Sequence, residues 1–423
     1  MLEGPGSLVA GRIRALVDGL ADELVAVRRD LHAHPEVAHT EMRTTALVAD
    51  RLRAAGLRPH LLPGTGLVCD IGPGAVETGR KRVALRADLD ALPVPDTCGE
   101  PWHSTVAGVS HACGHDVHTS VVLGAGLVLA QLADQLPAGV RLIFQAAEEV
   151  QPGGAVAAVE AGAMDGVGHV FALHCDPRVD AGRLGSRPGP ITAASDPVAV
   201  TLTAEGGHTS RPHLTGDVVF ALGQVITQVP AVLGRRLDPR AGVNLTWGHV
   251  HAGSAGNAIP STGTVRGTLR CLEPRAWEEA GAVLQEAVEH VVAPYRVQVD
   301  VQHLRGVPPV ENEPHATRLL EAAARDVLGA DAVEATEQSL GGEDFAWLLT
   351  RAPGAMARLG TRVPGGRSYD LHRGDFTVDE SAIATGARVL ARVALLAGEH
   401  PSPTVPAVAP ALPAPSLRNI PNP

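Results

Sequence analysis

Short apolar strands alternate with helical patterns between residues 81 and 176, and this alternation constrains the fold more than any other feature of the sequence. Strands that alternate with helices form a mostly parallel sheet with helices on both faces. We therefore predict an α/β domain. The predicted strands are Lys81–Val94, Val140–Glu149 and His169–Asp176, and the predicted helices between them are His118–Leu136 and Gly154–Met164.

Elements on both sides of this core extend the domain. Helical spacing at Leu8–Arg29 and Thr40–Ala55 precedes it. After Pro309 the alternation resumes, and these later elements most economically complete the first domain, which makes that domain discontinuous. They are the helices Pro314–Leu328, Gly342–Leu349 and Asp379–Ala397 and the strand Ala355–Arg362.

The pattern changes near Ala194, where an inserted domain is predicted. Its β-α-β-β-α-β order is that of the ferredoxin-like split βαβ unit. The predicted elements are Pro197–Gly206, Gly216–Arg236, Gly242–Gly253, Gly263–Leu272, Pro274–Pro294 and Tyr295–Leu304. We assign 1–194 and 307–400 to a catalytic domain, 195–306 to a lid and dimerisation domain, and 401–423, with eight prolines, to a disordered tail.

The charge of the chain limits its partners. A net charge of -11 and a pI near 5.9 argue against nucleic acid or an anionic membrane as a main partner, because either favours a basic surface. With 45% hydrophobic residues the chain can bury a sizeable core. A small-molecule substrate is the better expectation.

The expected compartment is the cytoplasm. Five widely spaced cysteines, an odd number, speak against a disulfide framework. Charges interrupt the apolar positions of the first 36 residues, so no signal-peptide core is drawn there. No stretch approaches the 18 or more apolar residues needed to span a bilayer.

The segment Ser110–Ser120, S-H-A-C-G-H-D-V-H-T-S, is the densest chemical cluster of the sequence. A thiolate and neutral imidazoles so close together are ligands for borderline metals. The alternative is a polar loop with incidental histidines. The candidate side chains are those of His111, Cys113, His115, Asp116 and His118.

Further chemical side chains follow the predicted strands: Asp88 and Asp90, then Glu148 and Glu149, then His174. In open α/β sheets, ligands bind beyond the carboxyl ends of the strands, so this placement favours an active site. Asp90, in the sequence D-L-D-A-L-P, is expected to orient a ligating imidazole by a hydrogen bond. An ordinary turn at the strand end explains the same residues.

Two adjacent carboxylates repel each other unless a cation neutralises part of their charge. Because neighbouring side chains point in different directions, one of Glu148 and Glu149 can bind metal while the other acts as a general base. Two solvated glutamates are the alternative. His174 stands in an apolar strand as a ligand or as a hydrogen-bonded core residue. His372 lies where a final ligand is expected.

Three polar residues of the inserted domain suit a substrate with a carboxylate. His208 follows a Gly-Gly turn, Asn257 opens N-A-I-P, and Arg270 ends the strand T-V-R-G-T-L-R. A histidine donor and an amide suit an oxyanion, and a guanidinium binds a carboxylate with two parallel hydrogen bonds. Surface polarity without a function is the alternative.

Eight short motifs occur in order along the chain: R-R-D-L-H-A-H-P-E, A-L-R-A-D-L-D-A-L-P, H-A-C-G-H-D-V-H, A-E-E, L-H, G-G-H-T-S-R-P-H, N-A-I-P and G-G-E-D-F. Together these motifs resemble the metallo-amidohydrolases related to carboxypeptidase G and aminoacylase. The narrower resemblance is to hippurate hydrolases, N-acyl-amino-acid amidohydrolases and auxin-conjugate hydrolases. It extends from about Val25 to Gly398.

The resemblance implies two divalent metal ions, with zinc or manganese expected most. It implies Glu148 as the general base, with His208, Asn257 and Arg270 at the scissile carbonyl and the product carboxylate. The two ions would share a bridging water and lower its pKa, so that hydroxide attacks an amide carbonyl. The implied metal ligands are Cys113, His115, Glu149, His174 and His372.

The expected activity is hydrolysis of N-acyl amino acids by a homodimer, with His208 acting in its own or the partner subunit. A dipeptidase or carboxypeptidase of the same fold, a silent metal-binding protein and a structural protein remain alternatives. Two departures from the family pattern stand out. The context D-L-H-R-G-D-F makes His372 the least secure ligand, and Gly342 occupies a position where serine is expected.

Overall fold

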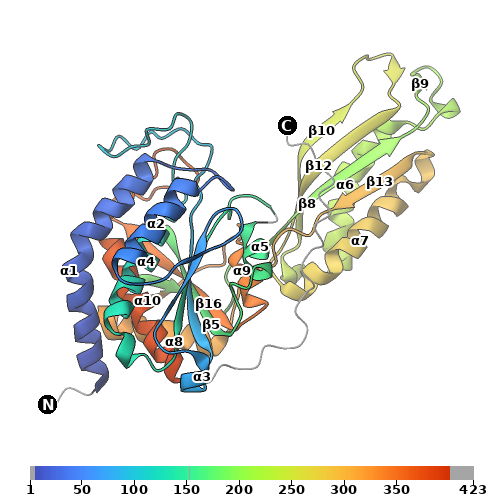
Figure 1. Cartoon of the computed structure of the whole chain (residues 1–423). Coiled ribbons are helices and arrows are strands. Elements are labelled where there is room, and N and C mark those ends of the chain that lie inside the picture. Colours follow the sequence, from blue (N-terminus) through green and yellow to red (C-terminus); the bar gives the residue numbers. More distant parts are fainter. Residues whose placement is uncertain (1–4, 152, 401–423) are drawn as a thin grey trace. The chain divides into compact units, whose positions relative to one another are not determined.

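The computed structural model describes residues 5–151 and 153–400, so the predicted tail 401–423 lies outside the described residues (Figure 1). The described chain divides into two compact units. The main unit contains the residues up to Ile191, Glu311–Glu337 and the residues from Asp344 onward. The inserted unit contains Thr192–Val310 and Gln338–Glu343. The second of these segments was predicted to belong to the catalytic domain, so its assignment differs from the prediction.

An eight-stranded sheet forms the centre of the main unit, in the order β1-β2-β4-β3-β5-β16-β6-β15. β3 is parallel to β4 and β5, and β5 is parallel to β16. This confirms the predicted parallel core, whereas β1 and β2 add an antiparallel edge that was not predicted from the sequence. The strands are β1 (His60–Leu61), β2 (Leu67–Ile71), β3 (Arg82–Asp88), β4 (Val140–Gln145), β5 (Val167–Asp180), β6 (Leu184–Ser186), β15 (Val333–Ala335) and β16 (Gly354–Arg362).

Helices cover both faces of this sheet. On one face α10 packs against α1, α4 and α8, and on the other α5 packs against α9 (Figure 1). Leu85, Phe144 and Phe171 of the central strands are fully buried, and each such side chain contributes about 1.5–3 kcal/mol. The helices are α1 (Pro5–Ala33), α2 (Met42–Ala54), α3 (Ala75–Thr78), α4 (His115–Gln131), α5 (Gly154–Glu160), α8 (Pro314–Leu328), α9 (Phe345–Leu349) and α10 (Ser381–Glu399).

Two boundaries near the chemical residues differ from the sequence prediction. Helix α4 begins at His115 rather than His118, so His115 and Asp116 lie on its first turn instead of in a loop. Strand β5 continues to Asp180, so His174 lies within the strand rather than at its end. His174 is nevertheless close to the level at which β3 ends, because Arg86 of β3 is opposite Ala172.

The inserted unit has the predicted β-α-β-β-α-β order. Its four strands form an antiparallel sheet in the order β10-β12-β8-β13, and a two-stranded pair, β9 with β11, lies beyond it. Helices α6 and α7 pack against each other and against this sheet. The elements are β8 (Ala194–Thr203), β9 (Gly207–His208), α6 (Val218–Arg236), β10 (Asn244–Ala252), β11 (Ala258–Ile259), β12 (Thr262–Cys271), α7 (Pro274–Val292) and β13 (Gln298–His303).

Helices α6 and α10 are each long and apolar enough to cross a membrane, judged by length and composition alone. The expectation that no stretch comes near this limit is therefore wrong. Isolated polar or charged residues, such as Gln224 in α6 and Arg388 in α10, interrupt the apolar run but leave its mean hydropathy high. Core helices pass the same test, and 78% of the apolar window of α10 is buried. For α6 the buried share is 33%.

Candidate metal centre

The turn before α4 places the first two predicted ligands. Gly114 has φ 88°, and a Cβ atom there would lie 2.8 Å from Sγ of Cys175, so this position requires glycine. The turn puts Cys113 directly before the helix and His115 on its first turn, and both side chains are buried.

Asp90 holds the backbone of the acidic pair. Its Oδ1 accepts from the Glu148 N–H at 3.0 Å and its Oδ2 from the Glu149 N–H at 2.9 Å. Ala147, just before the pair, has a left-handed φ of 56°, and its N–H donates to the buried Glu41 carboxylate at 2.8 Å. Backbone strain of this kind persists only where the surroundings enforce it, as they do in many active sites.

Asp90 also reaches His115, with 3.3 Å between Asp90 Oδ1 and His115 Nδ1. An imidazole oriented through Nδ1 offers Nε2 to a metal. Asp90 therefore lies where its predicted orienting role requires it.

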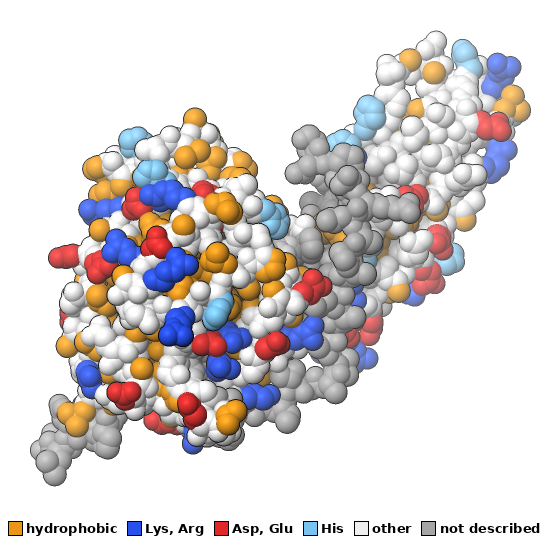
Figure 2. Space-filling model, viewed as in Figure 1, with side chains coloured by type: hydrophobic (Ala, Val, Ile, Leu, Met, Phe, Trp, Pro, Cys, Tyr) orange, Lys and Arg blue, Asp and Glu red, His pale blue; other side chains and the backbone are white. Residues whose placement is uncertain are grey.

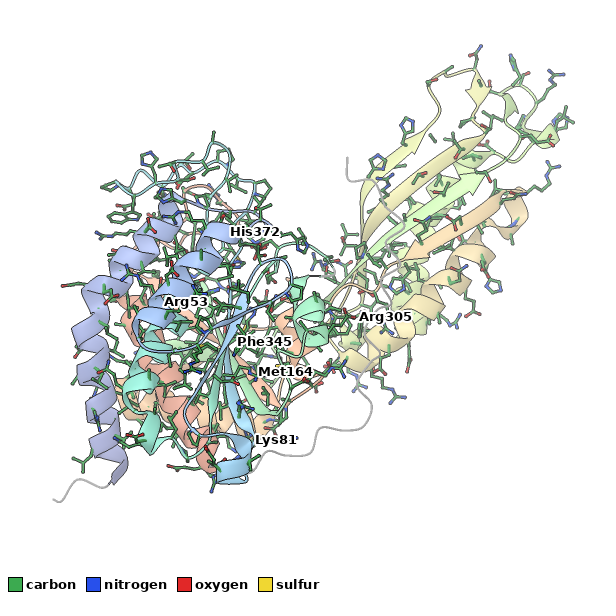
Figure 3. All side chains as sticks on the ribbon, in the orientation of Figure 1. Arg53, Lys81, Met164, Arg305, Phe345 and His372 are labelled. Carbon is green, nitrogen blue, oxygen red and sulfur yellow. The ribbon has the colours of Figure 1, made fainter. Side chains whose placement is uncertain are left out.

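His174 and His372 approach the same residues from two further segments. His174 Nδ1 donates to the carbonyl oxygen of Cys175 at 2.8 Å, which leaves the lone pair of Nε2 facing Cys113 Sγ at 3.7 Å. His372 comes from the loop after β16 (Figure 3). Its backbone N–H donates to Ala112 at 2.8 Å, and its Nε2 lies 3.3 Å from Glu149 Oε1. His372 therefore lies in the cluster, although the sequence around it differs from the family pattern.

The six predicted metal-centre residues fall into three overlapping groups. Within each group the ligand atoms lie within 4.8 Å of one another, and the shared members join the groups into one cluster. Cys113, His115, Glu149, His174 and His372 supply the atoms that a metal would need, and Glu148 lies among them. The groups are Cys113 with His115 and His174, Cys113 with Glu149 and His372, and His115 with Glu148 and Glu149.

The other polar residues of the opening cluster have different partners. His118 Nε2 accepts from the Cys175 N–H at 2.8 Å, so its proton is on Nδ1, which lies 2.7 Å from Asp88 Oδ1. Asp116 pairs with Arg28 and His32 instead of a metal-centre residue. Burial lowers the pKa of His111 to about 4, which keeps its imidazole neutral. Packing and orientation, rather than ligation, fit His118 and Asp116.

Two supporting contacts were not predicted from the sequence. Glu41, which is fully buried, accepts hydrogen bonds from Ala147 and from the Thr65 hydroxyl. Arg86 of β3 donates to Asp88 and to Asp344, each at 2.8 Å. A charged residue in the middle of the predicted apolar strand was the available signal for Arg86. Nothing local marked Glu41.

The three candidate residues of the inserted unit do not lie together. His208 and Asn257 are neighbours in the β9–β11 pair, which follows the end of β8 at Thr203. Thr262 of β12 pairs with Thr203, whereas Arg270 pairs with Ser195 at the other end of β8. Arg270 is therefore roughly 26 Å along β12 from Thr262, at about 3.3 Å per residue. The two sets of residues stand at opposite ends of one sheet, and the question of whether His208 serves its own or the partner subunit stays open.

The segment Gln338–Glu343 contacts the Arg270 end of this sheet. Arg270 Nη1 donates to the carbonyl oxygen of Leu340 at 2.7 Å. A Cβ atom on Gly342 would lie 2.8 Å from Val307 Cγ2 and 2.9 Å from Ser195 Cβ. The backbone at Gly342, where serine was expected, therefore lies too close to Val307 and Ser195 for a side chain. A serine at this position would force these two neighbours to move.

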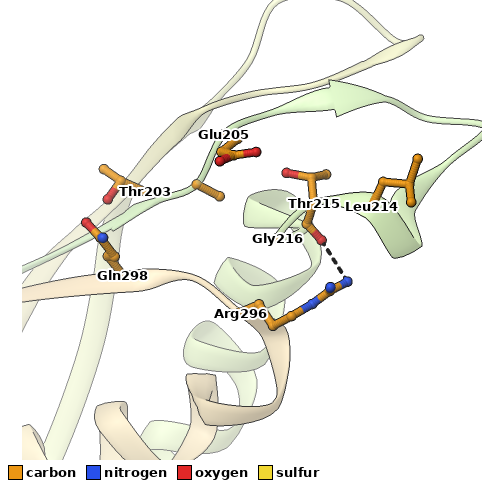
Figure 4. Close-up of a pocket in the computed structure, with 8 residues that line it drawn as sticks. Thr203, Glu205, Leu214, Thr215, Gly216, Arg296 and Gln298 are labelled. Carbon is orange, nitrogen blue, oxygen red and sulfur yellow. Dashed lines mark hydrogen bonds between the residues drawn. The ribbon is translucent and has the colours of Figure 1, made fainter.

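At the other end of the sheet, an open cleft of about 470 Å³ is lined by Thr203, Glu205, Thr215, Arg296 and Gln298, among others (Figure 4). Arg296 Nη2 donates to the backbone oxygens of His213 and Thr215, at 2.7 and 3.3 Å. None of the predicted site residues lines this cleft.

The model of the peptidase family M20/M25/M40 matches residues 84–396. The chain belongs to this family. The resemblance found in the sequence is thereby confirmed, and the protein is an M20-family hydrolase. Its solved relatives include the Bacillus subtilis YXEP protein, described as a dinuclear metal binding peptidase, with 30% identity and a TM-score of 0.78. The match covers 90% of this chain and 99% of that chain.

Curated relatives of the M20 chain carry several names. The N-acetyl-L-cysteine deacetylase of Bacillus subtilis is 35% identical over 86% of this chain and 85% of its own length. A Rhodococcus jostii protein with the provisional name glutamate–cysteine ligase 2-3 is 50% identical over 87% of this chain. The chain spans only 46% of the length of that second protein.

The charge distribution of the cluster fits the dinuclear centre of such a relative. Burial disfavours the charged form of His115, yet Asp88, Asp90 and Glu149 outweigh burial and raise its pKa to about 10. Nε2 of His115 and Oε1 of Glu149 are buried and make no hydrogen bond in the described part of the chain. A surplus of negative charge around such atoms favours a bound cation.

Burial, reinforced by Glu149, Glu148 and Asp88, raises the pKa of Cys113 well above its usual value. A thiolate at this position therefore needs a cation beside it. The donor set of one thiolate, three imidazoles and a carboxylate suits zinc, and it also accepts manganese, cobalt or nickel.

Proposed function

We propose that this M20-family hydrolase is a metal-dependent amidohydrolase that cleaves N-acyl amino acids. The observation that carries the proposal is the meeting of five metal-type ligands with one further carboxylate, Glu148, within a few ångströms. A dinuclear peptidase centre with an adjacent base is the arrangement that water needs to attack an amide carbonyl.

The metal ions, two in number and proposed to be zinc or manganese, would be held by Cys113, His115, Glu149, His174 and His372. Bound divalent ions supply a water molecule whose pKa is lowered toward neutrality. Glu148 takes the proton of the attacking water and returns it to the amide nitrogen, which leaves as the amine. Asp90 keeps the Glu148 backbone and the His115 ring in place during this transfer.

Arg270 is proposed to bind the carboxylate of the amino-acid product. Its guanidinium is half-buried, and its Nη1 donates to the Leu340 carbonyl. A guanidinium has five N–H donors, so others can serve a ligand. A half-buried arginine fork favours substrates with a free carboxylate over amides that lack one.

The names of the relatives narrow the acyl amino acids to test first. Two Bacillus subtilis relatives are named for N-acetylcysteine deacetylation, at 35% and 33% identity. The Rhodococcus protein carries the name of an enzyme that joins glutamate to cysteine. We therefore propose N-acetyl-L-cysteine as the first substrate and γ-glutamylcysteine as the second. A carboxypeptidase activity is the alternative, because two relatives from Saccharolobus solfataricus are named thermostable carboxypeptidases.

His208 is proposed to donate to the oxyanion from a partner subunit. Its Nδ1 accepts from the Ser210 N–H at 3.1 Å, so the neutral ring carries its proton on the exposed Nε2, which is ready to donate. Asn257, the residue before β11, lies close to His208, because its carbonyl oxygen accepts from the Thr209 N–H. Because His208 and Asn257 are far from Arg270 along one sheet, two subunits explain how all three residues serve one substrate.

The surface of the inserted unit supports a homodimer. β10 is an edge strand of its sheet and is mostly exposed, and edge strands pair readily with a second chain. Val219 and Phe220 of α6 and Val250 of β10 are each more than half exposed. Figure 2 shows hydrophobic and histidine side chains at the surface of this unit.

The test of the activity is a screen of the purified, metal-loaded protein. The screen compares N-acetyl-L-cysteine, other N-acetyl and N-benzoyl amino acids, γ-glutamylcysteine and dipeptides. Each compound is tested beside a counterpart whose free carboxylate is blocked as an amide. Turnover is expected for acyl amino acids with a free carboxylate. Turnover of dipeptides alone would replace the proposal with a peptidase, and no turnover of any amide would leave only a metal-binding protein.

The Arg270→Ala variant tests the carboxylate site. The loss in kcat/KM is expected to be at least tenfold greater for carboxylate substrates than for their blocked counterparts. Arg266→Ala, on the same strand, is the matched control. Equal losses on both substrate types would contradict the role of Arg270.

A mixing experiment tests the partner subunit. Glu148→Gln and His208→Ala chains are each inactive alone, but a mixed dimer contains one complete site. Random mixing in equal amounts makes half of the dimers mixed with one active site of two, so about a quarter of wild-type activity should return. If His208 acts within its own chain, mixing restores nothing.

A further inference from the structure

A second cluster of metal-type ligands lies outside the proposed dinuclear centre. The ligand atoms of His32, Asp96 and Cys98 lie within 4.8 Å of one another. His32 belongs to α1, and the other two belong to the loop that follows β3. This cluster shares no residue with the three groups of the dinuclear centre, and the proposed hydrolysis does not use it.

His32 is already oriented as metal-binding histidines are. Its Nδ1 lies 2.8 Å from Asp116 Oδ2, and Arg28 Nε lies 2.8 Å from the same carboxylate. A histidine that donates one ring N–H to a carboxylate presents its other nitrogen as a more basic ligand. That nitrogen, Nε2, lies 3.3 Å from Asp96 Oδ2.

The loop holds the other two ligands in place. Asp96 Oδ1 accepts from the Cys98 N–H at 2.9 Å, and Asp96 Oδ2 accepts from the Ser104 N–H at 2.7 Å. Asp96 and His32 side chains are nearly buried, whereas Cys98 is half-buried. The ligands are therefore fixed by their surroundings, and solvent reaches the cluster beside the thiol.

The charges also allow a divalent ion. Without metal, burial opposes the charge of His32, but Asp116 and Asp96 prevail and raise its pKa to about 10. The protonated ring and Arg28 then balance Asp96 and Asp116. A divalent ion that displaces one proton from His32 Nε2 and one from Cys98 Sγ leaves the same total charge.

We propose that His32, Asp96 and Cys98 form a third metal site for a thiophilic divalent ion of the zinc class, with water as the fourth ligand. One nitrogen, one oxygen and one sulfur ligand suit the tetrahedral preference of zinc. The ion would tie the loop at Asp96–Ser104 to α1, and through Asp116 to the first turn of α4. Binding releases two protons, so it strengthens as pH rises.

The simpler arrangement is a protonated His32 that bridges Asp96 and Asp116 with no metal. The two arrangements differ in what Cys98 does. In the metal site the thiolate is a ligand, so its loss removes the ion. In the proton bridge the thiol is dispensable, so its loss changes no metal content.

The test compares wild type with Cys98→Ser after loading with Zn²⁺ and removal of free metal. Bound zinc is measured by mass spectrometry, and Cys69→Ala, a buried cysteine outside both clusters, is the matched control. The variant is expected to bind one equivalent less than wild type, and the control the same amount as wild type. Equal zinc in wild type and Cys98→Ser would overturn the third site.

Cobalt provides a second readout that a folding defect does not imitate. With Co²⁺ in place of zinc, the sulfur-to-metal charge-transfer band should weaken in Cys98→Ser, while circular dichroism stays unchanged. An unchanged band would contradict the thiolate ligand. Both measurements count ions rather than turnover, so they hold whether or not the proposed hydrolysis is correct.

Discussion

The candidate metal centre and the β9–β11 end of the inserted unit represent two ways of building a site. In the metal centre, Cys113 and His115 are buried, and Asp90 fixes two backbone N–H groups and a ring. At the β9–β11 end, His208 and Asn257 are exposed, and Nδ1 of the His208 ring accepts from the Ser210 N–H. The fold itself therefore positions the buried residues, whereas the proposed role of the exposed residues would need a substrate or a second subunit to complete the site.

This difference separates stability from catalysis. A change within the buried network leaves polar groups without partners and so affects metal binding, folding and activity together. A change at the exposed end leaves the fold nearly unaffected, because surface substitutions usually alter stability by less than about 0.5 kcal/mol. If both regions serve one reaction, a change in either region lowers activity. Only a change in the buried network is also expected to lower metal binding and stability.

The largest effect is expected from Cys113→Ala. Loss of the thiolate removes a ligand shared by two of the three groups, so metal content falls and hydrolysis is lost. Metal analysis beside an activity assay checks this, with Cys69→Ala as the control. A full metal complement in Cys113→Ala would break the assignment of the thiolate.

His208→Ala should lower turnover nearly as much as Cys113→Ala does. It should leave metal content and thermal stability unchanged. Removing one oxyanion donor costs about 10²–10³ in kcat. Metal content and Tm should match wild type, because His208 is exposed. His213→Ala, an exposed histidine of the same unit, is the control. A large drop in Tm or in metal content would contradict the claim that changes at the exposed end affect turnover alone.

Asp90→Asn should affect metal affinity more moderately. The asparagine keeps the size of the side chain but replaces one accepting oxygen with an NH₂ group, which faces a backbone N–H donor. Loss of such a supporting carboxylate typically costs 10–100-fold in metal affinity or activity. Titration with a metal-competing dye measures the affinity, and wild-type affinity in the variant would contradict the role of Asp90.

The smallest effect is a pH dependence of stability in the metal-free protein. The folded-state pKa of His32 is raised to about 10 from 6.5, so its contribution is fully present below pH 6.5 and is lost as pH rises toward 10. The free energy of unfolding should fall by at most about 1.4 kcal/mol per pH unit in this range. Denaturant unfolding of wild type and His32→Gln at several pH values checks this, and identical slopes would contradict it.

The sequence predicted the order of the elements well because apolar periodicity and turn residues are local signals. It also predicted that Asp90, Glu148 and Glu149 meet the Cys113–His115 turn, since these residues follow parallel strands of one sheet. The metal and base roles of these residues stay predictions, although the geometry brings them together.

What the sequence could not predict depends on long-range packing. Glu41 supports Ala147 from 106 positions away, and no local pattern signals such a contact. The start of α4 was misplaced because the left-handed Gly114, not a polar N-cap side chain, begins the helix. The separation of His208 from Arg270 follows from strand register, which motif spacing does not encode.

Glu148→Gln tests the central claim most directly, because Glu148 is the one residue of the cluster assigned to proton transfer rather than to metal binding. The variant and its control Glu334→Gln are loaded with metal, and bound metal and kcat for the best acyl amino acid are measured on the same samples. We expect full metal content with kcat lowered by about 10²–10⁴. Unchanged turnover in a metal-loaded variant would contradict the account.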